Sequence, residues 1–492
     1  MCIQLSRRTF LAGAGAAALA VGRGAHAADR RPNILWIIVE DMSRNFGCYG
    51  ETTIETPHVD QLAAEGTRFD NAYVTGPVCS PSRSALITGM YQTTIGAQHH
   101  RSGRGDVKIE LPAHVRLIPA LFREAGYFVT NGQGVEMSRP GKTDYNFTCD
   151  NELYDGADWR KRPAGRPFFA QVQLAGGKYG QGHFERRPDV PHPVDPKDVT
   201  LPPYYPDHPV IRADWAHYLD TVTHTDDEVG AVMSMLEAEG VADSTVVFFI
   251  TDHGISHARG KQFLYEEGAH IPLIVWGRGR VPAGEVREDL ALHIDLAASA
   301  LHFAGIPIPA YLESRSLFGG EAAPREYIVC ARDRCDETEE RIRSVRKGTM
   351  KYIRNYFPKR PCLQPNRYKD DKDVMQVIRA LDAEGAFNKV QQLVTAKQRP
   401  PEELYDLAVD PYEIHNLAGD PDHADALADL RDVLARWIRE TGDQGQAREA
   451  MAQYDSDMAV YREQLVRYGS EKDVRTLDAN IEQMKAWRAK DW

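Results

Sequence analysis

Two acidic segments follow apolar runs that are typical of buried β-strands. Glu40 and Asp41 come directly after residues 34–39, and Asp252 and His253 follow residues 245–250. The carboxyl ends of parallel strands share one edge of a sheet, so we expect both segments to meet there although they lie far apart in the chain. Carboxylate oxygens are the ligands that Ca²⁺ and Mg²⁺ prefer, and the sequence therefore predicts a divalent-cation site at this edge.

A cysteine opens the segment Cys79–Gly89, whose sequence is CSPSRSALITG. Taken alone, the segment fits equally well a structural cysteine buried before a helix. With its flanking residues it resembles the signature of type I sulfatases, members of the alkaline phosphatase superfamily. In that family the pattern C-x-P-x-R directs oxidation of the cysteine to the aldehyde formylglycine.

The resemblance extends along most of the chain. Within the family, the spacing from Glu40 to Cys79 and the run Arg343–Arg346 are most similar to heparan N-sulfatases, also called sulfamidases. Blocks that resemble sulfatase sequences occur at residues 56–63, 272–274, 293–296, 403–407 and 410–417.

The resemblance also implies a ligand set for one divalent cation, Ca²⁺ first and Mg²⁺ as the alternative. Two positions depart from the family pattern: Glu40 stands where Asp is commoner, and His253 stands where Asn is more usual. Because the side chain of Glu is longer, Glu40 could shift the ion. The implied ligands are Glu40, Asp41, Cys79, Asp252 and His253.

Cleavage of a sulfate ester develops negative charge on the sulfate oxygens and on the departing atom, so fixed positive groups must surround the sulfur. The resemblance assigns Lys142 and Lys261 to sulfate binding and Arg83 to orienting the modified side chain. Counting from the strand expected at residues 168–174 places Lys178 near the site, where we expect it to supply charge.

The proton donor to the leaving group is left open by the sequence. Asp144 occupies the position, two residues after Lys142, where the family normally has a histidine. A histidine is suited to proton transfer near neutral pH, and three candidates remain: His183 on a glycine-rich loop, His99 and His100.

The mechanism that the resemblance implies begins with the hydrated aldehyde at position 79. One hydroxyl of this gem-diol attacks sulfur while the cation and lysines stabilise the charge, and the alcohol or amine leaves with a proton. The second hydroxyl then loses its proton and sulfate is expelled by C–O cleavage, which a serine or an unmodified cysteine could not achieve.

Strands that alternate with helices predict an α/β fold with a large, mainly parallel central sheet covered by helices. Helices are expected at residues 59–65, 115–124 and 215–239, and further strands at 127–130 and 271–276. Short strands at 327–331, 342–346 and 350–355 predict a smaller antiparallel unit with helices.

These patterns divide the chain into four parts. Residues 32–326 form the expected catalytic domain, residues 327–440 the smaller α+β subdomain and residues 441–492 a helical tail. Residues 1–27 contain Arg7 and Arg8, an apolar run and a small-x-small cleavage site, which resemble a bacterial twin-arginine export signal. The alternative, an N-terminal membrane anchor, is disfavoured because the apolar run is short.

The composition limits the kinds of molecule that the protein is expected to bind. The chain has 59 Lys and Arg against 71 Asp and Glu, a net charge of −12, which disfavours a nucleic-acid binder. No apolar stretch predicts stable membrane insertion.

The cysteines are sparse and lack metal-binding spacing. The sequence allows one or two disulfides but does not indicate which cysteines would pair. We expect a periplasmic or secreted protein with a sulfated sugar or polysaccharide as substrate, and the formylglycine-generating enzyme and twin-arginine machinery as maturation partners.

Two other functions stay open at this point. A phosphonate or phosphodiester hydrolase of the same superfamily could share the aldehyde and the metal ligands. An exported protein that binds anionic glycans without catalysis would instead keep Cys79 as an unconverted thiol.

Overall fold

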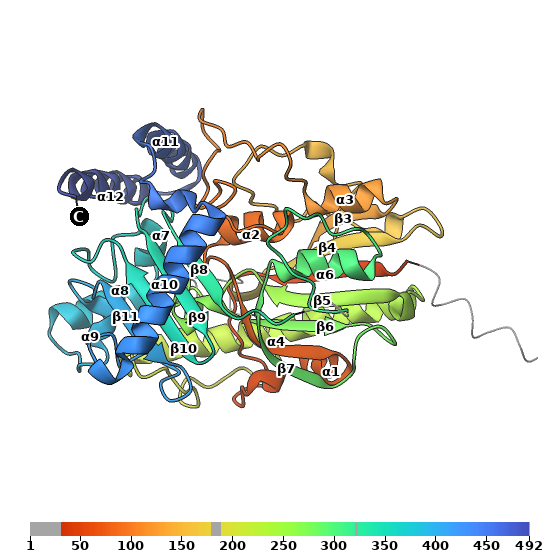
Figure 1. Cartoon of the computed structure of the whole chain (residues 1–492). Helices are drawn as coiled ribbons and strands as arrows, with labels where there is room; N and C mark the ends of the chain where they lie inside the picture. The colour runs from red at the N-terminus through yellow and green to blue at the C-terminus, as the bar shows by residue number, and fades with distance from the viewer. Residues whose placement is uncertain (1–30, 179–187, 320–322, 492) are drawn as a thin grey trace, which may run out of the picture.

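The computed structural model describes residues 31–178, 188–319 and 323–491 (Figure 1). The predicted export signal and His183 lie outside these residues. Two sheets form the framework, and the predicted fold class is confirmed: a seven-stranded, mostly parallel sheet in the order β3-β4-β1-β5-β6-β2-β7, and a four-stranded antiparallel sheet in the order β11-β10-β9-β8. Only β6 runs antiparallel to its neighbours in the described part of the large sheet.

The large sheet is built from β1 (Asn33–Val39), β2 (Thr67–Tyr73), β3 (Phe128–Gln133), β4 (Phe168–Leu174), β5 (Thr245–Thr251), β6 (His270–Trp276) and β7 (Glu285–Leu292). The small sheet contains β8 (Ile328–Arg332), β9 (Ile342–Lys347), β10 (Met350–Asn355) and β11 (Glu402–Asp406). The α-helices are α1 (Pro57–Glu65), α2 (Cys79–Thr88), α3 (Ile118–Glu124), α4 (Pro209–Ala238), α5 (Glu266–Ala269), α6 (Asp295–Phe303), α7 (Arg367–Asp370), α8 (Asp373–Ala383), α9 (Gln392–Thr395), α10 (Ala424–Thr441), α11 (Met451–Tyr468) and α12 (Glu471–Ala489).

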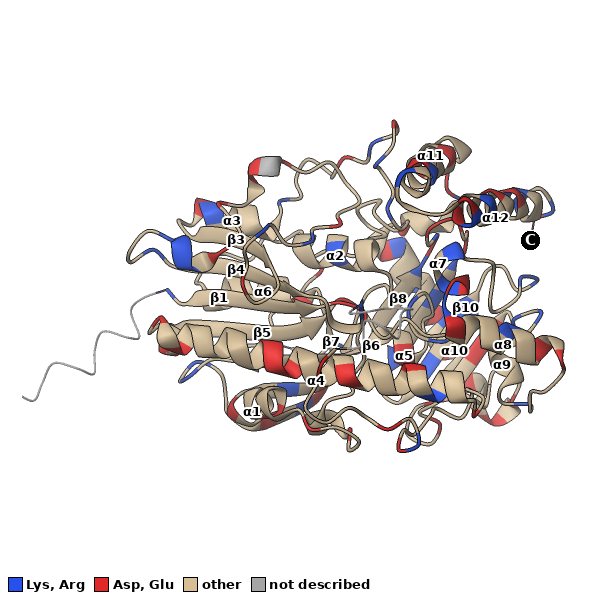
Figure 2. Cartoon of the chain, turned by 180° about the vertical axis from the view of Figure 1, so that it is seen from behind, with Lys and Arg blue, Asp and Glu red and all other residues tan. Residues whose placement is uncertain are grey.

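Helices cover both faces of the large sheet. Successive side chains of a strand point to opposite faces, and in β1 Trp36 belongs to one apolar cluster and Ile37 to the other. The cluster with Trp36 includes residues of α2, α3 and α6, and the cluster with Ile37 includes residues of α1 and α4. Figure 2 shows α4 running along the sheet with α1 below it. Burial on both faces explains why β1 and β5 are continuous apolar runs.

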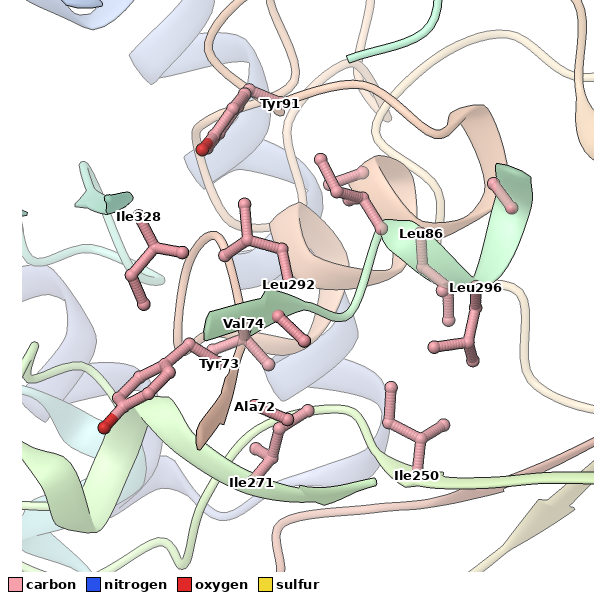
Figure 3. Close-up of a cluster of buried hydrophobic side chains, with 14 of the residues drawn as sticks. Ala72, Tyr73, Val74, Leu86, Tyr91, Ile250, Ile271, Leu292, Leu296 and Ile328 are labelled. Atoms are coloured by element: carbon pink, nitrogen blue, oxygen red, sulfur yellow. The ribbon is translucent and has the colours of Figure 1, made fainter. Parts of the chain in front are cut away.

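Three strands are not predicted by the sequence pattern: β2, β7 and β11. β2 has the sequence TRFDNAY, and its pairing shifts register between Phe69 and Ala72, so it lacks a clean apolar alternation. β7 is an edge strand whose first half is largely exposed. Packing with neighbouring strands holds β2 and β7 in the sheet. Ala72 of β2, Ile271 of β6 and Leu292 of β7 lie in one buried apolar cluster (Figure 3).

A buried arginine forms ion pairs with residues of the C-terminal segment 441–492. The guanidinium of Arg334 lies 2.6 Å from a carboxylate oxygen of Glu449 and 2.7 Å from one of Asp457, and its Nη1 donates to the carbonyl of His100 at 3.0 Å. The side chain of Arg334 is fully buried. Paired acids are required because an unpaired buried charge is strongly destabilising.

The six described cysteines, Cys48, Cys79, Cys149, Cys330, Cys335 and Cys362, are all free thiols. Among the described helices, none combines the length and the hydrophobicity needed to cross a membrane.

Replacing Ile37 by Ala should lower the free energy of unfolding by about 2–5 kcal/mol, because the side chain is fully buried in the central strand β1. Urea unfolding followed by circular dichroism measures the change. Val466→Ala in α11, where the side chain is 62% exposed, is the control and should change stability by no more than about 0.5 kcal/mol. Equal losses in both variants would contradict the position of β1 in the core.

Candidate active site

The ends of three adjacent strands are level at one edge of the large sheet. Val39 of β1 pairs with Leu174 of β4 on one side and Thr251 of β5 on the other. Glu40 and Asp252 are the next residues of β1 and β5, so the strand register places both acidic segments at this edge, as predicted.

Asp41 turns the chain away from the sheet. Its φ is 49°, in the left-handed region that Asp tolerates better than most residues. Its backbone N–H donates to Oδ1 of Asp252 at 3.0 Å, which joins the two acidic segments directly.

Cys79 is the first residue of α2 and is buried against the same edge. Its Sγ lies 3.0 Å from Nζ of Lys261, 3.2 Å from Nε2 of His253 and 3.4 Å from Nζ of Lys178. Burial on its own would raise the pKa of the Cys79 thiol, but Lys142, Lys178 and Lys261 together hold this pKa well below its usual value.

Four of the five predicted metal ligands gather around one point. Donor atoms of Asp41, Cys79, Asp252 and His253 all lie within 4.8 Å of one another, and all four side chains are buried. This spacing suits a single divalent ion, since two ligands on opposite sides of Ca²⁺ are separated by about 4.6–5.2 Å. Buried carboxylates also need compensating positive charge. The donor set therefore fits a hard cation, the more so if an oxygen replaces the sulfur at position 79.

Glu40 lies outside this group of four. Its Oε2 accepts hydrogen bonds from Nζ of Lys142 at 2.8 Å and from Nζ of Lys178 at 2.5 Å. Arg83 lies 3.7 Å from its other oxygen. In this arrangement Glu40 positions the basic side chains around the site.

Four basic side chains line the site, and all four were predicted: Arg83, Lys142, Lys178 and Lys261. Lys261 donates to both carboxylate oxygens of Asp41, at 3.2 and 3.0 Å. Arg83 donates to Asp252 at 3.1 Å and to the side-chain oxygen of Gln173 in β4 at 2.7 Å. Burial would raise the pKa of Asp41, but Lys178, Lys261 and His253 hold it well below the usual range.

The two candidate histidines that the structure describes, His99 and His100, have different neighbours. A ring nitrogen of His100 lies within 4.8 Å of the sulfur of Cys79 and of a carboxylate oxygen of Asp144. Nδ1 of His100 lies 2.9 Å from Asp336, and its buried Nε2 has no hydrogen-bond partner among the described residues. His99 instead accepts from the backbone N–H of Arg334 at 3.3 Å and is absent from the group around Cys79.

The same two histidines have opposite electrostatic surroundings. Burial lowers the pKa of His99 to about 4. Burial would also lower the pKa of His100, but the Asp336 carboxylate beside its ring raises it to about 10. His100 therefore carries a proton on both ring nitrogens near neutral pH.

Basic side chains surround the carboxylate of Asp144 and stabilise its negative charge. It forms ion pairs with Arg104 and, at 3.5 Å, with Lys142. Burial would raise the pKa of Asp144, but Lys142, Arg104 and Arg101 lower it far below its ordinary value. Asp144 is therefore an acceptor at neutral pH and not a proton donor.

Two residues that contact the site were not predicted from the sequence. Tyr368, in α7, donates its hydroxyl to Oδ2 of Asp41 at 3.4 Å, and its ring lies 5.0 Å from Nζ of Lys261. Asp336 lies in the connection between β8 and β9 and contacts His100. Neither belongs to a motif or follows a strand of the large sheet, so no local signal in the sequence marks them.

At one edge of the large sheet, acids, a histidine and lysines surround a cysteine at a helix N-terminus, an arrangement suited to the hydrolysis of an anionic ester. A model of the sulfatase family matches residues 32–306. An ulvan-active sulfatase of Formosa agariphila is 33% identical over 459 residues, which cover 84% of this chain and 76% of that protein. The human N-sulphoglucosamine sulphohydrolase is 29% identical over 469 residues, covering 84% of this chain and 91% of that protein.

Solved structures share the fold. A 2-O GAG sulfatase matches with a TM-score of 0.61 at 21% identity and covers 86% of this chain and 95% of its own. The phosphonate monoester hydrolase of Agrobacterium radiobacter matches with a TM-score of 0.60 at 16% identity and covers 84% of this chain and 96% of its own. The chain belongs to the sulfatase family, as its motifs indicated, and is a hydrolase of sulfate esters or sulfamates.

If Asp41 is the ligand that the sequence predicts, replacing it by Asn should weaken Ca²⁺ binding at least tenfold, because a neutral amide would take the place of a charged oxygen. Isothermal titration of the protein with CaCl₂, after treatment with a chelator, measures the affinity. Asp429→Asn removes an equally charged but exposed carboxylate that pairs with Lys347, and serves as the control. Equal affinities of the two variants would exclude Asp41 as a ligand.

Proposed function

We propose that the protein removes sulfate groups from a sulfated carbohydrate, in the manner of a heparan N-sulfatase. The observation that carries this proposal is the convergence of Lys142, Lys178 and Lys261 on Cys79 and the acids beside it. Sulfated carbohydrate is favoured because the relatives that align with most of this chain include an ulvan-active sulfatase and an N-sulphoglucosamine sulphohydrolase.

The proposal includes two groups that complete the site. Asp41, Asp252, His253 and the side chain at position 79 would hold one divalent cation, Ca²⁺ in preference to Mg²⁺, and the cation would supply positive charge beside the sulfate oxygens. Cys79 would be converted to formylglycine, which supplies a nucleophilic hydroxyl and a route to release sulfate.

The chain's own residues bind and orient the substrate. Lys142 and Lys178 are about one-quarter exposed, so they reach the solvent side of the site and can contact a sulfate that enters. Lys261 is buried and approaches the sulfur from inside. Because the three ammonium groups are fixed before the substrate arrives, they stabilise the charge that develops on the sulfate oxygens.

His100 is the proton donor that the geometry favours for the leaving group. Nδ1 lies 2.9 Å from Oδ1 of Asp336, and the attraction between the two charges holds this side of the ring toward the carboxylate. This leaves the proton on Nε2, which has no partner among the described residues, free to move to the departing oxygen or nitrogen. Arg83 acts differently: held by Asp252 and Gln173, it keeps the start of α2 in place beside the acids.

Export completes the proposal. The twin-arginine signal at residues 1–27 would direct the folded protein to the periplasm or beyond, after the formylglycine-generating enzyme has acted on Cys79.

The experiment that tests this function measures sulfate release from defined N- and O-sulfated glucosamine oligosaccharides, with the mass of the peptide that contains Cys79 determined in parallel. We expect release from at least one oligosaccharide and the mass of the aldehyde at position 79. Hydrolysis of aryl phosphonate in preference to every sulfated substrate would favour a phosphonate hydrolase. An unaltered thiol with no hydrolysis would favour a protein that only binds anionic glycans.

Replacing His100 by Ala should lower kcat/KM for an unactivated sulfated sugar by about 10²–10⁴-fold, because the departing atom loses its proton donor. The loss should be much smaller for 4-nitrophenyl sulfate, whose leaving group needs no proton. His99→Ala is the matched control and should affect both substrates alike. The same loss for both substrates in His100→Ala would assign His100 a structural role.

A further inference from the structure

A cavity lies apart from the site around Cys79. Its volume is about 590 Å³, and it is bounded by the segment that follows β1, by β2, by the start of β6 and by the end of β9. It therefore lies between the large and the small sheet. None of its lining residues belongs to the group of donors around Cys79. Three of them are arginines, Arg44, Arg68 and Arg346.

Aromatic rings hold these guanidinium groups in place. Arg44 and Arg68 both lie against the ring of Tyr49, with their Cζ atoms 5.0 and 5.4 Å from its centroid. Arg346 lies 5.0 Å from the ring centroid of Tyr73. The three groups are thus fixed in the folded protein, so little conformational entropy would be lost when they bind a ligand.

The acids that line the cavity are already engaged. Asp70 is paired with Arg68, with 2.8 Å between Oδ1 and Nε. Glu266 lies 2.9 Å from Nζ of Lys351 and 2.8 Å from Nδ1 of His270. Neither carboxylate can therefore fully neutralise the positive charges of Arg44 and Arg346.

Arg44 and Arg346 contact mainly neutral groups. Arg44 bonds to the backbone carbonyl of Asp70 and lies 2.7 Å from Nε2 of His270, and it forms no ion pair with a carboxylate in the described parts of the chain. Arg346 donates to the carbonyl of Gly348 at 3.1 Å and to the side-chain oxygen of Asn71 at 2.9 Å. Its nearest carboxylate oxygen, on Glu266, is 3.7 Å away.

The positive charges disfavour one another. Burial and, to a smaller extent, the charge of the neighbouring Arg44 lower the pKa of Arg346 to about 10. Burial likewise lowers the pKa of Arg44; Tyr49, Glu266 and Asp70 offset part of this effect, and Arg68, the weakest of these influences, adds to it. An anion between the guanidinium groups would remove this unfavourable energy, and a planar guanidinium presents two parallel N–H donors to a tetrahedral oxyanion.

We propose that this cavity is a second oxyanion site, in which Arg44, Arg68 and Arg346 bind a sulfate group. The sulfate could be the free ion or a further sulfate on the carbohydrate chain, since both present the same oxygens to the arginines. The assignment does not depend on the reaction at Cys79.

Diffraction from crystals soaked in selenate tests the site directly, because the anomalous signal of selenium locates the anion. We expect a peak in the cavity within hydrogen-bonding distance of Arg44 and Arg346. Absence of a peak there overturns the proposal, whether or not selenate occupies the site around Cys79. This measurement uses the unaltered protein, so it does not depend on whether a variant folds.

Kinetics of the double variant Arg44→Gln, Arg346→Gln distinguishes the two sources of sulfate. If the cavity binds the carbohydrate, KM for the sulfated polysaccharide should rise by about tenfold or more, because two charge-assisted contacts are lost, while 4-nitrophenyl sulfate is hydrolysed as before. With selenate bound in the crystal, an unchanged KM assigns the cavity to the free ion. Arg278→Gln, an exposed arginine paired with Glu237, is the matched control.

Discussion

Mutual compensation of buried charge is the constraint on which the structure depends. Asp41 and Asp252 are buried side by side, and burying two acids together is strongly destabilising without the basic groups that contact them. Lys261 and Arg83 supply that charge, each from a different element of the fold. The fold therefore cannot form this edge of the sheet without also assembling a strongly polar centre.

Segments next to the small sheet contribute directly to this centre. Tyr368 reaches Asp41 from α7, and Asp336 reaches His100 from the connection between β8 and β9. Because the two contacts arise from separate segments, α7 and the connection between β8 and β9 both help to position residues of the site.

Much of the site could be predicted because its signals are local. Asp41 and Asp252 follow apolar strands immediately, and Cys79 stands within a continuous motif, so residue order alone marks them. Asp336 and Tyr368 carry no such mark, because their roles arise from contacts between distant segments. The choice among the histidines was undetermined for the same reason: only the fold brings His100, and not its neighbour, to Cys79.

Strands likewise differ in whether the local sequence predicts them. β1 and β5 are recognisable because burial on both faces requires apolar residues throughout, whereas β2 and β7 are half-exposed or irregular and depend on their neighbours for pairing. Domain boundaries, like strand order, are properties of packing and have no local sequence signal.

The contacts of Arg334 have a consequence for the order in which the protein is made. This arginine supports the backbone at His100, yet its own charge is compensated by Glu449 and Asp457. A nascent chain that is still emerging from the ribosome therefore lacks the partners that stabilise this corner of the site. This corner of the site is therefore complete only after the segment that carries Glu449 and Asp457 has been made and packed.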